Sequence, residues 1–400
     1  MGESSVRRRK GDTIDVLLSA GSVTQGFATA QPQVVTVATR AQRRAFVELP
    51  YTLYAGHPHW VPPLRRDEYR RLDPSHNPFF EHADMQRWLA MEGERVVGRI
   101  AGIVDHLHDE KYRERVAFFG FFEARTEAAA RVLVEAVAAW GRARGATLLR
   151  GPVNPSMNES AGLLIDAFDA DPYVLMPYNP PAYAGYLEAT GLRKVKDLWA
   201  WDIDLRDPQL HRITRLADRV RQRHGIVVRP IDLSRFDREL ETLQGLYRTA
   251  WQENWGFVAP TDAEIRQLAV DLKPVLDPEL LLFAEMHGRV VGCSVGIPDV
   301  NQVLRQMNGR LLPFGLWHFL RRRRTVTRGR ILLMGVVPEA RRIGLYPLLI
   351  AECHRRGVGR GYVRAELSWT LEDNDAVNAG IEAAGGRRYK TYRMYERAIG

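Results

Sequence analysis

The residues with the clearest chemical potential lie between Arg330 and Tyr346, in the sequence RILLMGVVPEARRIGLY. The apolar first part has the length and branched side chains of a buried strand, which Pro338 ends because it lacks an N–H for the ladder. A basic, Gly-containing turn then precedes an amphipathic helix. Free N–H groups and partial positive charge at the start of such a helix suit a phosphate or pyrophosphate group.

A second stretch, the loop RGPVNPSMNES, is rich in short polar side chains; it carries Asn154, Ser156, Asn158 and Glu159. Short polar side chains of this kind bind polar ligands, but they also commonly cap turns. The residues alone leave both interpretations open.

A third stretch combines apolar and aromatic residues with a run of arginines between residues 311 and 324. Its members are Leu311, Leu312, Phe314, Leu316, Trp317, Phe319, Leu320 and Arg321 to Arg324. This composition is typical of a segment that contacts an anionic membrane surface. The alternative is a surface helix whose apolar side packs on its own domain while the arginines face water.

Composition and length indicate a folded protein of two domains. The chain has 400 residues with 45% apolar residues and a net charge of +9, which permits polyanionic partners without selecting one. No apolar run approaches the roughly 18 residues that span a membrane, and the N-terminus lacks a secretory core. Two cysteines without metal-ligand spacing predict a reduced, cytoplasmic protein that holds no metal.

Periodicity predicts alternating strands and helices after a polar, disordered leader at residues 1–32. The expected strands span residues 34–39, 86–91, 95–105, 116–123, 147–151, 193–204, 226–231, 280–285, 289–297, 331–337, 362–369 and 387–396. The expected helices span residues 40–54, 126–144, 182–190, 212–224, 238–254, 262–272, 345–356 and 376–384.

The order of these elements repeats. Arg95–Gly98 corresponds to Arg289–Gly292, and Gly191 corresponds to Gly385, both at a spacing of 194 residues. Two anchors at one spacing indicate an internal duplication. The predicted organisation is therefore an N-terminal domain at 33–206, a connecting helix at 207–224 and a C-terminal domain at 225–400.

The element order and one motif together resemble the GNAT superfamily of acyl-CoA N-acyltransferases. The motif V-x-P-x-x-[RQ]-x-x-G-x-[GA] is matched by Val336, Pro338, Arg341 and Gly344, with Tyr346 where a small residue is usual. The chain looks most like bacterial proteins with two tandem GNAT folds, a group linked in part to long-chain N-acylation, including bacterial ceramide synthesis. The resemblance implies an α/β (α+β) fold of two GNAT-like domains, each with a mixed, mostly antiparallel central sheet flanked by helices.

The resemblance also implies a site for acyl-CoA in the second domain. The residues expected to hold it are Val336, Val337, Arg341, Arg342, Gly344, Leu345 and Tyr346. The aligned turn of the first domain, residues 123–130, contains two acids, Glu123 and Glu127, and no glycine, so that domain is expected to bind no CoA.

For catalysis, the resemblance implies a base that deprotonates an amine and an acid that protonates the leaving thiolate. Strand alternation makes Glu366 the candidate base, although it could instead pair with an arginine. The tyrosine usual in this family is replaced by Ile381, so Tyr392 or Tyr389 is the expected substitute acid. Asn154, Ser156, Asn158 and Glu159 would then bind the acceptor if the two domains face each other.

The leading hypothesis is an acyl-CoA-dependent N-acyltransferase acting on a primary amine, with a lipid or sphingoid-type amine at the membrane surface as one interpretation. The segment 311–324 would then provide a peripheral contact with the inner membrane face. A Fem-type transferase that uses aminoacyl-tRNA and a non-catalytic acyl-CoA-binding module are the alternatives. Nucleic acid is the less expected partner.

Overall fold

One mixed sheet of 13 strands runs through the computed structural model, which describes residues 31–310 and 325–400. Residues 32–400 form one compact unit. The predicted leader, apart from its last two residues, and the apolar and basic segment 311–324 lie outside the described residues. Residues 33–206 are called the first half of the chain, and residues 225–400 are called the second half.

Each half contributes its strands to this sheet in sequence order. The strands of the first half are β1 (Gln33–Thr36), β2 (Ala83–Glu92), β3 (Arg95–Asp105), β4 (Val116–Ala124), β5 (Leu148–Gly151), β6 (Leu163–Leu164) and β7 (Arg193–Asp204). Those of the second half are β8 (Val227–Pro230), β9 (Leu281–Met286), β10 (Arg289–Pro298), β11 (Arg328–Val336), β12 (Arg364–Leu371) and β13 (Arg387–Ala398).

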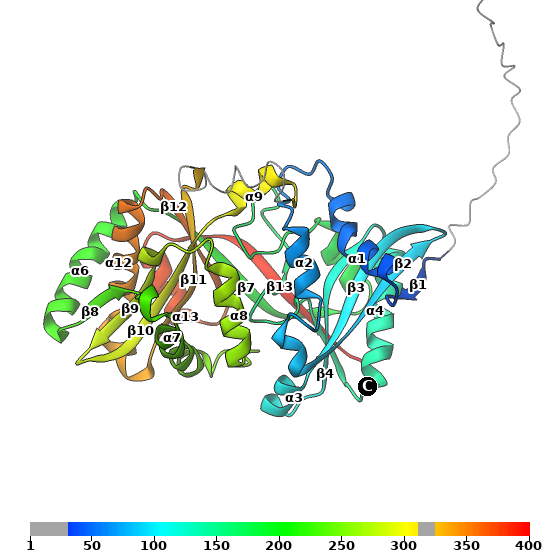
Figure 1. Ribbon diagram of the computed structural model, residues 1–400, viewed down its shortest axis with the longest axis horizontal. Helices are drawn as coiled ribbons and strands as arrows, with labels where there is room; N and C mark the ends of the chain where they lie inside the picture. The colour runs from blue at the N-terminus through cyan, green and yellow to red at the C-terminus, as the bar shows by residue number, and fades with distance from the viewer. Residues whose placement is uncertain (1–30, 311–324) are drawn as a thin grey trace, which may run out of the picture. The chain divides into compact units, whose positions relative to one another are not determined.

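The two halves exchange their last strands. The sheet order is β1-β2-β3-β4-β5-β13-β7-β12-β11-β10-β9-β8, with β6 beside β13. Strand β13 of the second half pairs antiparallel with β5 of the first, and β7 of the first half pairs antiparallel with β12 of the second. Figure 1 shows β7 and β13 in the middle of the molecule. The predicted pair of mixed, mostly antiparallel sheets is thereby confirmed, but the two sheets are joined into one.

Helices cover both faces of this sheet. They are α1 (Arg40–Leu53), α2 (Arg65–Arg71), α3 (His106–Tyr112), α4 (Glu127–Arg142), α5 (Ala182–Glu188), α6 (Pro208–His224), α7 (Phe236–Trp251), α8 (Asp262–Leu272), α9 (Asn301–Met307), α12 (Leu345–Gly359) and α13 (Asp375–Ala383). The 3-10 helices are η1 (Pro78–Glu81), η2 (Leu233–Arg235), η3 (Pro278–Leu280) and η4 (Pro338–Ile343). None of the helices in the described part of the chain is long and apolar enough to cross a bilayer.

The core of each half follows from strand alternation. In β3, Ile100 belongs to the apolar cluster under α4, whereas Ala101 belongs to the cluster under α1. In β9, Phe283 packs in the cluster with α7 and Ala284 in the cluster with α12. Since successive strand residues point to opposite faces, each half is a sheet between two helical layers.

Candidate active site

Strands β11 and β12 diverge after a short parallel pairing. The last pair is Ile331 and Leu367. Beyond it β11 stays on β10 as far as Val336, while β12 shifts register and continues on β7 to Leu371. A gap therefore opens between the two strands, and Leu333 on one side and Thr370 on the other both line the large cavity that borders it.

The equivalent gap in the first half is filled by its own chain. Strands β4 and β5 pair in parallel only as far as Phe118 and Arg150. The segment after β5 then lies along β4, with the Asn154 Oδ1 accepting a hydrogen bond from the Phe121 N–H at 2.5 Å. A Cβ on Gly120 would lie 1.6 Å from the Val153 carbonyl oxygen. Only the second half therefore keeps an open gap.

The basic turn at the end of β11 leads directly into α12. Gly344 adopts a φ of +85°, which glycine tolerates best, and no described side chain caps the helix. The N–H groups of Leu345 and Tyr346 therefore remain available to a ligand, whereas Pro347 in the same turn has no N–H. The guanidinium of Arg341 donates to the Ala250 carbonyl at 3.2 Å, which holds it against the end of α7.

The residues predicted to hold the cofactor fall into two groups. Arg341 and Tyr346 line the cavity beside the gap, and burial raises the pKa of the Tyr346 phenol. The other five do not line the cavity. Val336 and Leu345 are buried in the core, Val337 packs against it, Arg342 is exposed, and a Cβ on Gly344 would lie 3.0 Å from Val220 of α6.

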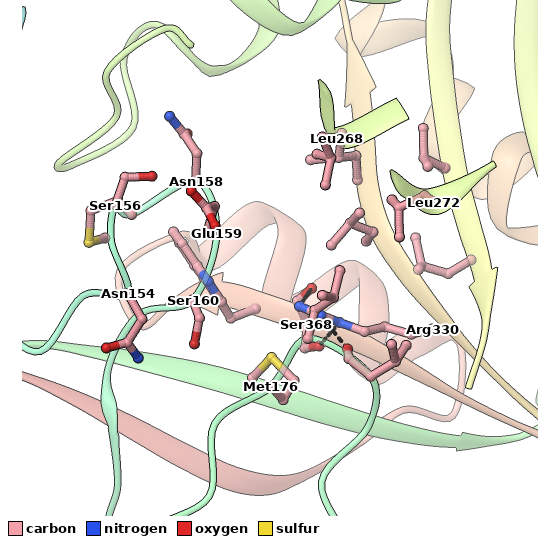
Figure 2. Close-up of a pocket in the computed structure, with 18 of the residues that line it drawn as sticks. Asn154, Ser156, Asn158, Glu159, Ser160, Met176, Leu268, Leu272, Arg330 and Ser368 are labelled. Atoms are coloured by element: carbon pink, nitrogen blue, oxygen red, sulfur yellow. Dashed lines mark hydrogen bonds between the residues drawn. The ribbon is translucent and has the colours of Figure 1, made fainter. Parts of the chain in front are cut away.

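A cavity of about 1840 Å³ joins the gap to residues from both halves. Typical pockets for small ligands enclose roughly 300–1,000 Å³, so this cavity can hold a longer or bipartite ligand. Figure 2 shows polar residues of the first half on one side and apolar residues of α8 on the other.

The apolar wall comes from the second half. Its members include Leu240, Leu243, Ile265, Leu268, Leu272 and Leu333. Helix α8 has no buried residue among its 11, because its apolar side faces this cavity. An apolar surface turned toward a cavity is suited to a hydrocarbon chain.

The polar wall is formed by the loop after β5, and all four predicted acceptor-binding residues, Asn154, Ser156, Asn158 and Glu159, line it. The Ser156 Oγ is buried without a hydrogen-bond partner among the described residues. Asn158 is held by the second half, because its Nδ2 donates to the Val258 carbonyl at 2.8 Å and its Oδ1 accepts from the Tyr247 hydroxyl at 3.1 Å.

Glu159 presents a carboxylate to the cavity and makes one long ion pair with another described residue. Its nearest cation is Arg71 of α2, at 3.6 Å between Nε and Oε2, and 31% of its side chain is accessible. Burial raises the pKa of this carboxyl group to about 7; Arg71 opposes the rise, and the carboxylates of Glu264 and Glu68 add to it.

A buried network lies at the point where β11 and β12 diverge. Arg330 and Ser368 line the cavity, and the Arg330 Nε donates to the Ser368 Oγ at 2.8 Å. The Ser368 Oγ donates to the Glu366 Oε1 at 2.5 Å, and the Tyr389 hydroxyl donates to the Glu366 Oε2. Burial and the Glu366 carboxylate raise the pKa of Tyr389. Glu366 is thus fully buried with both oxygens engaged.

The two predicted catalytic residues lie behind the cavity wall. Neither Glu366 nor Tyr392 is among the described residues that line the cavity. Tyr392 is fully buried beside Leu164 and Leu198, and its hydroxyl has no hydrogen-bond partner in the described part of the chain. Burial raises the pKa of this phenol.

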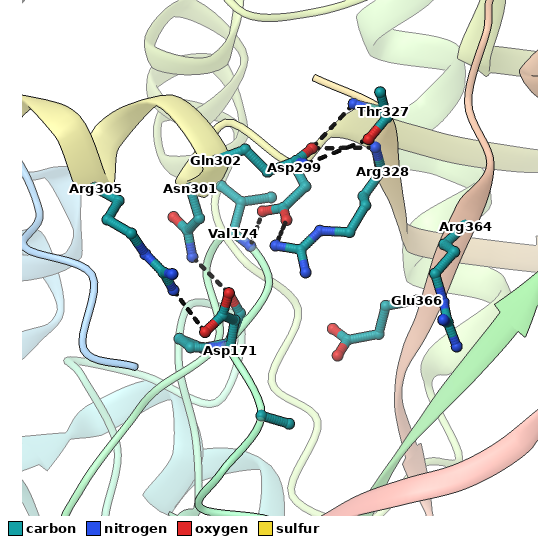
Figure 3. Close-up of polar contacts among 12 residues, drawn as sticks. Asp171, Val174, Asp299, Asn301, Gln302, Arg305, Thr327, Arg328, Arg364 and Glu366 are labelled. Carbon is teal, nitrogen blue, oxygen red and sulfur yellow. Dashed lines mark hydrogen bonds and ion pairs between the residues drawn. The ribbon is translucent and has the colours of Figure 1, made fainter. Parts of the chain in front are cut away.

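Asp299 anchors the first half to the second in a way the sequence did not indicate. Its Oδ1 accepts a hydrogen bond from the Val174 N–H at 2.9 Å, and its Oδ2 lies 2.7 Å from a guanidinium nitrogen of Arg328 (Figure 3). Burial raises the pKa of this carboxyl group to about 6, although Arg328 opposes the rise. The sequence repeat relates Asp299 to Asp105, which instead caps α3.

Further second-half side chains hold the same first-half loop. They are Asn301, whose Nδ2 donates to the Pro172 carbonyl at 3.0 Å, Arg305, which lies 2.6 Å from Asp171, and Lys390, whose Nζ donates to the Ala170 carbonyl at 2.7 Å. Arg330 also donates to the Val174 carbonyl at 2.6 Å. The loop that borders the cavity is therefore held in place by the second half.

The fold and the site define a class of protein. A duplicated mixed sheet, with diverging parallel strands followed by a basic turn and helix, is the arrangement expected of two GNAT folds. A solved tandem GNAT protein from the clavulanic acid biosynthesis pathway superposes with a TM-score of 0.54 at 15% identity, over 92% of this chain and 99% of that one. At this identity the likeness shows the fold. No family model matches the chain.

Two curated relatives are similar in sequence to almost the whole chain. The bacterial ceramide synthase of Caulobacter vibrioides is 40% identical over 382 residues, covering 92% of this chain and 98% of its own. Protein YghO of Escherichia coli is 34% identical over 377 residues, covering 92% and 96%. The chain belongs to the same family as these two relatives, which confirms the resemblance to relatives of bacterial ceramide synthase seen in its sequence.

Proposed function

We propose that the protein is an acyl-CoA-dependent N-acyltransferase that transfers an acyl group to a primary amine. The observation that carries this proposal is that one cavity connects the gap between β11 and β12 to a polar wall and an apolar wall. The gap supplies a place for a thioester, and the polar wall supplies a place for an amine. Holding both reactants in one site is the main requirement of direct acyl transfer.

In this proposal the phosphates of acyl-CoA lie at the turn before α12. The uncapped helix start and the charge of Arg341 and Arg342 favour a pyrophosphate there. The pantetheine arm follows the gap, which brings the thioester to Arg330 and Ser368 where the strands diverge. The filled gap and acidic turn of the first half support a single acyl-CoA site, in the second half.

The acceptor in this proposal is an amine that carries a lipid-like chain, such as a sphingoid-type amine. A polar wall facing an apolar wall suits a molecule with a polar head and a hydrocarbon tail. The volume of about 1840 Å³ supports two long chains better than one small substrate. The name of the Caulobacter relative, bacterial ceramide synthase, points to the same class of acceptor.

The test is a purified-protein assay that follows free thiol release from short and long acyl-CoAs with a panel of amines. We expect release to require both substrates and to be fastest with a long acyl chain and a lipid amine. Saturable acyl-CoA binding without thiol release for any amine would instead indicate a binding module. Steeply salt-dependent tRNA binding would favour the aminoacyl-tRNA alternative.

A further inference from the structure

We infer that Glu159 of the first half is the base that removes a proton from the acceptor amine, an assignment that rests on the proposed acyl transfer. Glu159 lies on the polar wall of the cavity, on the side opposite the apolar helix α8 (Figure 2). The neighbouring Asn158 is bonded to Tyr247 and Val258 of the second half. Glu159 is therefore held toward the half that would carry the acyl-CoA.

The carboxylate of Glu159 is free to accept a proton. Among the described residues it accepts no hydrogen bond, and its one ion pair, with Arg71, is 3.6 Å long. Glu366 differs because it is fully buried and both of its oxygens accept hydrogen bonds, from Ser368 and Tyr389. A base must reach the proton it abstracts, and Glu366 has no path to the cavity without rearrangement of this network.

The other carboxylates near the polar wall are less suited to the role. Glu68 pairs with Arg71 at 3.1 Å, and Glu264 lies 3.2 Å from the His82 Nε2. Asp271 accepts a hydrogen bond from Gln267 at 3.0 Å. Asp67, in the first turn of α2, also lines the cavity, and burial raises the pKa of its carboxyl group, but the residue is more exposed than Glu159.

The electrostatic surroundings of Glu159 support this assignment. The groups that act on it are Arg71 and Glu68 of α2 and Glu264 and Asp271 of α8, and with burial they place its pKa at about 7. A base with a pKa near the working pH combines a large deprotonated fraction with a useful proton affinity. The surrounding negative charge also favours entry of the acceptor in its ammonium form.

The proposed step conserves atoms and charge. The ammonium group of the acceptor gives one proton to the Glu159 carboxylate and becomes a neutral amine. Its nitrogen attacks the thioester carbonyl carbon, so that a C–N bond forms and the C–S bond breaks. The electron pair of that bond leaves on the thiolate, which takes up the second proton lost by nitrogen. Glu159 then releases its proton to solvent.

The experiment compares the wild type with Glu159→Gln, using thiol release with a long acyl-CoA and the best amine at pH values from 5.5 to about 9. For the wild type, kcat/KM should rise with pH through about 7, because the carboxyl group must lose its proton. Glu159→Gln should lower kcat by about 100-fold or more and remove this rise, while the Kd for acyl-CoA stays unchanged. Unchanged acyl-CoA binding also shows that the variant is folded.

Two further variants keep the result decisive. Glu110→Gln removes a carboxylate from α3, outside the described cavity lining, and should leave both the rate and the pH profile as in the wild type. Glu159→Asp should restore part of the rate together with the rise near pH 7. Retention of rate and pH profile by Glu159→Gln would overturn the assignment while the proposed function stands. No thiol release by the wild type with any amine would overturn the proposed function first, and the assignment with it.

Discussion

The side-chain oxygen of Asn158 accepts a hydrogen bond from the Tyr247 hydroxyl at 3.1 Å, across the boundary between the two halves of the chain. Asn158 belongs to the polar loop after β5, and Tyr247 belongs to α7 of the second half. The polar wall of the cavity is therefore built from the first half but positioned by the second. Each half alone lacks part of the site.

Loss of this contact should weaken binding of the acceptor amine and leave binding of acyl-CoA unchanged. Tyr247→Phe removes one hydrogen bond worth about 1 kcal/mol, so we expect a rise of about fivefold in the KM for the amine. The Kd for acyl-CoA should not change. Tyr186→Phe is the matched control, since the Tyr186 hydroxyl makes no hydrogen bond among the described residues. An equal effect of both variants would contradict this role for Tyr247.

The turn before α12 can be tested with two glycines of similar backbone conformation. Gly344 has a φ of +85° and Gly361 a φ of +86°, so alanine at either position should cost about 1 kcal/mol of stability, and somewhat more at Gly344, where the Cβ would lie 3.0 Å from Val220. Only Gly344→Ala should also weaken acyl-CoA binding, because it disturbs the start of the helix that is proposed to hold the phosphates. Titration calorimetry with acyl-CoA measures the difference. Equal Kd values for the two variants would place the phosphates elsewhere.

The apolar wall should determine which acyl chains or lipid tails are accepted. Leu268→Trp with Leu272→Trp adds bulk to the cavity side of α8, and we expect the kcat/KM for long-chain substrates to fall at least tenfold. The kcat/KM for short acyl-CoAs should fall only a little. The control Arg266→Trp adds one tryptophan to α8 outside the described cavity lining. Equal losses for short and long chains would show that the wall does not contact the chain.

Asp299 should give the stability a defined pH dependence. Its carboxyl pKa rises from 3.8 to about 6 on folding because the group is buried. A raised pKa means that the folded state holds the proton more tightly, so this contribution is fully present below about pH 4 and is lost as the pH rises through about 6. The stability of the wild type relative to Asp299→Asn should therefore fall across this window, by at most on the order of 3 kcal/mol.

Denaturant unfolding of both proteins at several pH values measures this difference. A difference that stays constant between pH 4 and 6 would mean that the carboxyl group titrates normally. Asp171→Asn serves as a comparison, because hydrogen bonds and ion pairs with Arg305 and His59 lower the pKa of that carboxyl group despite its burial.

The exchanged strands predict that the halves do not fold separately. A fragment of residues 207–400 keeps α6 but lacks β7 and β5, the neighbours of β12 and β13, so both strands would present unpaired edges. We expect the fragment to aggregate or to lack a cooperative unfolding transition. Coexpression with residues 1–206 should restore soluble protein. A stable, cooperatively unfolding fragment would show that the exchange is dispensable.

The sequence predicted the regular elements well where side-chain periodicity is strong. The expected strands at 95–105 and 193–204 and the helix at 262–272 match β3, β7 and α8 in both ends. The helices α2, α3 and α9, of seven residues each, were missed, whereas α5, of the same length, was predicted at 182–190. α2 nevertheless supplies Arg71, the ion-pair partner of Glu159.

The sequence by itself determined the duplication, the class of fold and the turn at Arg341 to Gly344, because these depend on local order and spacing. Only the tertiary structure decided which carboxylate faces the cavity. Glu366 and Glu159 are both polar residues at positions that sequence reasoning singled out, but burial and hydrogen bonding depend on neighbours distant in the chain. Ser368 and Tyr389 enclose Glu366, whereas the exchange of strands and the anchoring of Asn158 turn Glu159 toward the site.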